Sequence, residues 1–171
     1  MVCEVSARGS IEVGPPEAAR SIPRSARITV SDQDPYDIDV RLSWDDDEQR
    51  LVADDVRITR RQNGPGVRIA EVSTLKLGHL IPEALIGEVL DDRGWPGVVE
   101  DHAGADPAAV DALVYAMAHA LGGLKPTQTV ALARGLQPGS AIKRVMKARQ
   151  LGFLGEANKG RSGGLAAEPT E

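Results

Sequence analysis

The sequence predicts an α+β fold, in which an N-terminal antiparallel β-meander with one covering helix precedes a C-terminal three-helix helix-turn-helix unit. Between residues 26 and 75, apolar and polar residues alternate in short runs that are separated by turn residues, which is typical of half-buried strands. From residue 106 onward, apolar residues recur at helical spacing, with Pro and Gly where helices begin and end. We expect two domains, a β-rich one over 25–92 and a helical one over 106–155.

The segments outside these domains have the composition of loops and tails. Residues 1–24 are rich in Pro, Gly, Ser, Ala and Glu, which predicts a disordered N-terminal segment. Residues 93–105 contain Pro and Gly without a hydrophobic period, and we interpret them as a linker between the domains. Residues 156–171 combine Gly, Ser, Ala and charged residues, which predicts a disordered C-terminal tail.

The β-rich domain is expected to hold three or four strands. The clearest is IDVRLSW, in which apolar residues at every second position face one side of the sheet and Asp39, Arg41 and Ser43 face the other. The run Asp45, Asp46, Asp47 predicts a hairpin turn, and LGHLIPEALIGEVL predicts a covering helix that begins near Ile81, because Pro82 suits a first turn. The expected strands are 26–30, 38–44, 51–60 and 67–75.

Three helices are expected in the C-terminal domain. Asp106 before Pro107 predicts the start of the first, which Gly122 and Gly123 end. Thr127 is the expected N-cap of a short second helix with Gly135 just past its end. A tight turn then leads to Ser140 as the N-cap of a third helix over about 141–151.

Charge is distributed unevenly along the chain. The protein has a net charge of -5, yet residues 125–161 carry eight basic residues and one acidic residue, a net of +7. Affinity for nucleic acid depends on the cations at the contacting surface, so this local excess favours a nucleic-acid partner despite the acidic total.

The basic residues of the third helix fall on one face. At about 100° per residue, Ser140, Lys143, Arg144, Lys147 and Gln150 share an arc of about 120°. The opposite, packing face is expected to hold Ala141, Ile142, Val145, Met146 and Ala148, with Arg149 as an exception among them.

This arrangement predicts a helix that lies in the major groove of double-stranded DNA. The groove accepts one helix, and the exposed face of that helix must offer donors to phosphates and base edges. Lys143, Arg144 and Lys147 are expected to face the groove, Ser140 and Gln150 to add hydrogen bonds, and Lys125 and Arg134 to contact backbone phosphates.

The C-terminal segment also resembles a family. PTQTVALARGLQPGSAIKRVMKARQLGFLG is similar to the helix-turn-helix of small, largely uncharacterised actinobacterial proteins that have a β-rich N-terminal domain, and the upstream STLKLGHLIPEAL is similar as well. This resemblance implies DNA binding and a role in transcription regulation. Two residues depart from the usual pattern, since Arg134 and Arg144 occupy positions that are commonly apolar in helix-turn-helix motifs. The matching positions are Pro126, Thr127, Val130, Ala131, Gly135, Ser140, Ala141, Val145, Ala148, Arg149, Gly152 and Leu154.

Other functions receive less support from the sequence. The common nucleotide-binding, hydrolase and metalloprotease motifs are absent, so we expect neither an enzyme nor a bound cofactor or metal. The single cysteine, Cys3, and an N-terminus without an apolar core segment indicate a cytoplasmic protein with no membrane association.

The alternative function is a protein-interaction adaptor that keeps the helix-turn-helix fold without binding DNA. The β-rich domain is the expected surface for a homodimer or for a protein partner.

Overall fold

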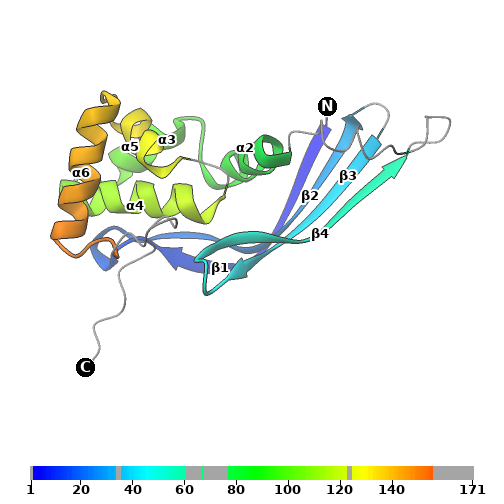
Figure 1. The fold of residues 1–171 in the computed structure, drawn as a ribbon, viewed down its shortest axis with the longest axis horizontal. Coiled ribbons are helices and arrows are strands. Elements are labelled where there is room, and N and C mark those ends of the chain that lie inside the picture. Colours follow the sequence, from blue (N-terminus) through cyan, green and yellow to red (C-terminus); the bar gives the residue numbers. More distant parts are fainter. Residues whose placement is uncertain (1, 34–35, 61–66, 68–76, 123–124, 156–171) are drawn as a thin grey trace.

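An antiparallel sheet of four strands is followed by five helices (Figure 1), which confirms the predicted α+β class. The computed structural model describes residues 2–33, 36–60, 67, 77–122 and 125–155. The elements are β1 (Val2–Val13), a short 3-10 helix η1 (Pro16–Ala18), β2 (Arg20–Gln33), β3 (Tyr36–Asp45), β4 (Arg50–Arg60), α2 (Leu77–Val89), α3 (Gly94–Asp101), α4 (Pro107–Ala120), α5 (Pro126–Arg134) and α6 (Pro138–Gln150).

Neighbouring strands pair in sequence order, as a meander requires. The inner face is apolar. Between β2 and β3, Ile28 lies opposite Val40 and Val30 lies opposite Ile38, and all four side chains are buried. The outer face is polar and carries ion pairs between neighbouring strands.

One of these outer ion pairs joins Arg27 to Asp39. Another joins Arg41 to Asp55, with 2.6 Å between Nη2 of Arg41 and Oδ2 of Asp55. The hydrogen bond from Arg41 lowers the pKa of the Asp55 carboxyl below its ordinary value. The alternation predicted for residues 38–44 therefore sorts apolar residues to the core and charged residues to water. The alternation predicted for residues 51–60 does not, because Leu51 is the one buried residue of β4 and Val56 is 42% exposed. The predicted turn at Asp45 is also confirmed, since its carboxylate accepts hydrogen bonds from the backbone amides of Asp47 and Glu48.

The expectation of a disordered segment over residues 1–24 is wrong. β1 pairs with β2 along its whole length, from Val2 opposite Ser31 to Val13 opposite Arg20. Pro23 is tolerated in β2 because β3 pairs with that strand only from Ser25 onward, so the missing amide of Pro23 leaves no break in the β2–β3 ladder. The strand expected at 26–30 is the central part of this longer strand. The strand expected at 67–75 falls, apart from Val67, outside the described residues, as does the tail at 156–171.

The linker expected over residues 93–105 contains α3. Trp95 and Val98 of this helix are buried in the core. The Arg93 guanidinium binds the carboxylates of Asp91 and Asp101, and Arg20 of β2 reaches Asp101 at 3.4 Å. The segment therefore packs against α4 and α5, and the ion pair of Asp101 with Arg20 connects it to the sheet. The preceding helix, α2, begins at Leu77 rather than near Ile81, with Pro82 inside it.

The sheet and the helices share one hydrophobic core. The sequence indicated one covering helix, but α4 packs on the sheet as well as α2, and α5 and α6 pack on α4 (Figure 1). At the end of β1, Gly14 has a φ of 101°, and a Cβ atom there would lie 2.7 Å from the Cδ1 atom of Leu113 in α4. A glycine at this position therefore allows both the positive φ and the close contact between the backbone after β1 and α4.

Candidate nucleic-acid interface

The predicted helix-turn-helix unit consists of α4, α5 and α6. Asp106 caps α4 as predicted, because its Oδ1 atom accepts a hydrogen bond of 2.7 Å from the amide of Ala108. Ala108 to Ala118 are all buried, since α4 has the sheet on one side and α5 and α6 on another. α6 lies at one end of the molecule (Figure 1).

A tight turn over residues 135–137 joins α5 to α6. Gly135 adopts a left-handed conformation with φ 60° and ψ 37°, and the amide of Leu136 donates to the carbonyl of Ala131 at 2.8 Å. The predicted caps of these helices are wrong, because the N-cap positions are Lys125 and Gln137, each followed by a proline. A proline in the first helical position already has the φ that a helix needs, so each helix starts earlier than Thr127 or Ser140 indicated.

The packing face of α6 is narrower than the sequence indicated. Ala141, Val145 and Ala148 are buried, but Ile142 and Met146 have 52% and 55% of their surface exposed. The two alanines are small and allow α6 to approach its neighbours closely. The three buried residues are spaced by four and three positions, which places them on one narrow face of the helix. Ile142 and Met146 lie about 100° from Ala141 and Val145 respectively, which turns them toward solvent.

The outward face of α6 carries Lys143 and Lys147, as predicted. The two lysines are one helical turn apart, and both are exposed. Neither ammonium is paired with a carboxylate of the residues that the structure describes. Ser140 and Gln150 are exposed on the same helix, and Lys125 is exposed where α5 begins.

Arg134 and Arg144 make a contact that the sequence did not indicate. Their Nε atoms donate to the two oxygens of one carboxylate, Asp111 in α4, at 2.7 Å and 2.6 Å respectively. Asp111 is only 2% exposed, whereas the side chains of Arg134 and Arg144 are 18% and 36% exposed. The Nη2 atom of Arg134 also donates to the carbonyl of Pro107 at 3.0 Å.

One buried carboxylate therefore joins all three helices of the unit. Arg144 and Arg134, which the sequence predicted to contact the groove and a phosphate, form ion pairs within the protein. This explains why two arginines occupy positions that are commonly apolar in helix-turn-helix motifs, since Asp111 supplies the opposite charge that burial demands.

Arg149, the exception on the predicted packing face, is also held within the protein. Its guanidinium carbon lies 5.2 Å from the centre of the Tyr115 ring, and its Nη2 atom donates to the Tyr115 hydroxyl at 3.1 Å. The other terminal nitrogen donates to the carbonyl of Gly155. Arg149 thus ties the end of α6 to α4.

Sequence reasoning missed the two α4 residues that hold these arginines. Asp111 and Tyr115 are four residues apart, so they lie on one face of the helix. Two features of the sequence could have indicated the contact with Asp111. Asp111 is a charged residue within the apolar run of α4, and Arg134 and Arg144 occupy positions at which apolar residues usually pack.

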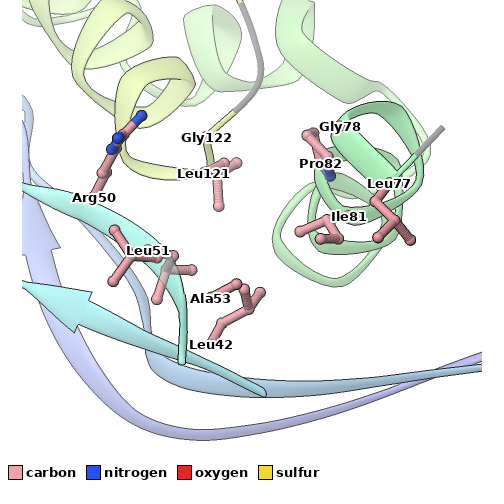
Figure 2. A pocket seen from close by; sticks show the side chains of 11 residues that line it. Leu42, Arg50, Leu51, Ala53, Leu77, Gly78, Ile81, Pro82, Leu121 and Gly122 are labelled. Atoms are coloured by element: carbon pink, nitrogen blue, oxygen red, sulfur yellow. The ribbon is translucent and has the colours of Figure 1, made fainter. Parts of the chain in front are cut away.

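An apolar pocket of about 250 Å³ lies between the sheet, α2 and the end of α4 (Figure 2). Among the described residues of the lining, Arg50 alone has a polar side chain, and it forms an ion pair with Glu48. The pocket has the volume for a small apolar group, but its described lining offers no unpaired polar group to orient one. The lining residues are Leu42, Arg50, Leu51, Val52, Ala53, Leu77, Gly78, Ile81, Pro82, Leu121 and Gly122.

Two further features bear on the class of protein. Within the described ranges, no helix has both the length and the apolar character needed to span a bilayer. The same residues contain no cluster of three or more His, Cys, Asp or Glu side chains placed to hold a metal ion.

No protein-family model, no curated protein and no solved structure matches this chain.

Proposed function

We propose that this protein binds double-stranded DNA through the outward face of α6 and acts in transcription regulation. The observation that carries the proposal is the pair Lys143 and Lys147 on α6. The two lysines lie one turn apart, and neither forms an ion pair with a carboxylate of the described residues. Their helix follows the tight turn after α5. A helix presented in this way fits the major groove, where its cations meet phosphates and base edges.

The charge of the surrounding segment supports this function. Residues 125–155 contain six basic residues and no acidic residue. Arg134, Arg144 and Arg149 are engaged within the protein, which leaves Lys125, Lys143 and Lys147 as the cations available to DNA. Ser140 and Gln150 are proposed to add hydrogen bonds from the same helix. A role on DNA is consistent with the cytoplasmic location expected from the sequence.

Three available cations predict a defined salt dependence. Each phosphate neutralised contributes about -0.9 to the slope of log K against log salt, so we expect a slope of about -3 per protein chain. Lys143→Ala or Lys147→Ala should weaken binding and reduce the magnitude of the slope by about 1, without loss of thermal stability, because both side chains are exposed. Fluorescence anisotropy with a labelled duplex of about two helical turns, between about 50 and about 200 mM salt, measures both quantities.

Arg57→Ala is the matched control for these variants. Arg57 is exposed on β4, and its removal changes the net charge of the protein by the same amount as either lysine substitution. We expect its binding curve to follow that of the unmodified protein. If the lysine variants and Arg57→Ala bind equally well, the outward face of α6 is not the DNA-contact surface.

A protein-interaction adaptor is the second candidate function. It is favoured by exposed apolar side chains on α5 and α6, since Leu132 is 65% exposed and Ile142 and Met146 are more than half exposed. The adaptor would bind a protein with weak salt dependence and would have no affinity for duplex DNA in the anisotropy experiment. The homodimer expected through the β-rich region remains a prediction, and sedimentation equilibrium measures it directly.

A further inference from the structure

Two large apolar side chains lie on the face of α6 that also carries Lys143 and Lys147. Ile142 and Met146 are 52% and 55% exposed, and they are four residues apart, so they form a continuous apolar strip along the helix. On the helix, Ile142, Met146, Lys143 and Lys147 together span about 140°. The face that packs against α4 is made of other residues, so the core does not account for this strip.

The adjoining charges restrict what can cover this strip. Residues 125–155 contain no carboxylate, and Lys143 and Lys147 directly follow Ile142 and Met146 in the sequence. A second copy of the chain packed face to face on the strip would bring four lysine ammonium groups together, which is unfavourable in a desolvated contact. A surface that combines negative charge with small apolar groups satisfies both kinds of side chain.

The major groove of DNA is such a surface. Its phosphates are negative, and the 5-methyl group of each thymine is an apolar group on the groove wall, which cytosine and guanine lack. Apolar side chains on a helix in the groove contact these methyl groups, whereas lysines reach phosphates and guanine acceptors.

We infer that Ile142 and Met146 contact thymine methyl groups in the major groove, so that the protein prefers thymine-containing sites. This inference rests on the proposed DNA binding and adds to it the chemical group that is recognised. It assigns the lysines mainly to affinity and the two apolar residues to sequence preference.

Replacing thymine by deoxyuridine tests the inference, because the substitution removes the methyl group and keeps the base-pairing groups. Four labelled duplexes of equal length serve as probes: alternating A·T, alternating A·U, alternating G·C, and alternating G·C with 5-methylcytosine, which places a methyl group in the groove of a G·C pair. Burying one methyl group corresponds to about a fourfold gain in affinity. We therefore expect the A·T duplex to bind at least about fourfold more tightly than the A·U duplex, and 5-methylation of cytosine to strengthen binding by a similar factor.

The Ile142→Ala/Met146→Ala double variant should bind the methylated and unmethylated duplexes with equal affinity. Both side chains are exposed, so the fold is expected to be retained, which circular dichroism checks. Lys143→Ala is the matched control, because it should weaken binding to all four duplexes and leave the methyl preference unchanged.

The possible failures are distinguishable. If the unmodified protein binds all four duplexes equally, the methyl inference is overturned and DNA binding stands. If the methyl preference persists in the double variant, the preference comes from the DNA itself, and the inference is also overturned. If no duplex binds at about 50 mM salt, both the proposed function and the inference fail. If equal binding is accompanied by self-association that the double variant abolishes, a second copy covers the strip instead.

Discussion

The Arg134→Met/Arg144→Met double variant is expected to lose about 3–5 kcal/mol of the free energy of unfolding. Both substitutions keep an unbranched side chain of similar length, but they remove the two cations that bind Asp111. That carboxylate is 2% exposed and would then be a buried charge without a partner. Since whole domains are stable by only about 5–15 kcal/mol, such a loss is a large part of the total. Urea unfolding followed by circular dichroism measures it.

Adding Asp111→Leu to this double variant should restore most of the lost stability. A buried ion triad can often be replaced by apolar residues of similar volume at little cost, because the desolvation of the charges disappears with them. Lys143→Met/Lys147→Met is the matched control on α6, and it should unfold at the same urea concentration as the unmodified protein. A triple variant no more stable than the double variant would show that the loss comes from packing of the arginine side chains and not from the unpaired carboxylate.

Val145→Asp is expected to unfold the helical unit, with a loss of more than about 3 kcal/mol. Val145 is 6% exposed on the face of α6 that packs against the core, so a carboxylate at that position would be buried among apolar side chains. The expected result is a large decrease in the urea midpoint together with loss of helical circular dichroism signal.

The neighbouring residue provides the control for this variant. Met146→Asp introduces the same charge one residue later on the same helix, but Met146 is 55% exposed. Its midpoint should change little. Equal destabilisation by the two substitutions would contradict the packing of α6 described here, and it would favour the wider packing face that the helical wheel indicated.

The strands that could be predicted were those with one clean apolar face. In β3, Ile38, Val40 and Leu42 are buried and their neighbours are not, so the alternation alone identifies the strand. β1 could not be identified in this way. Its apolar residues Val5 and Ile11 are only partly buried, and the Ser, Ala, Arg and Gly residues between them give the composition of a disordered segment. Its stability comes from pairing with β2, which is a long-range contact that composition does not reveal.

The helical unit was predictable in its order but not in its contacts. Asp106 and Gly135 mark a start and an end by local backbone chemistry, so both could be identified from the sequence. The roles of Arg134 and Arg144 depend on Asp111, which is 23 and 33 residues away. A helical wheel places a side chain on a face but does not show which groups on other helices it meets. The ion pairs of the two arginines with Asp111 therefore could not be predicted from the helical wheel.

The most direct test of DNA binding by α6 is a nuclear magnetic resonance titration. Backbone amide resonances of isotopically labelled protein are followed while a duplex of about two helical turns is added at about 50 mM salt. We expect the largest shift changes along the outward face of α6, at Ile142, Lys143, Met146 and Lys147, with smaller ones near Lys125 and none on the outer face of the sheet. Shift changes confined to the sheet, or none at all, would contradict the proposed function.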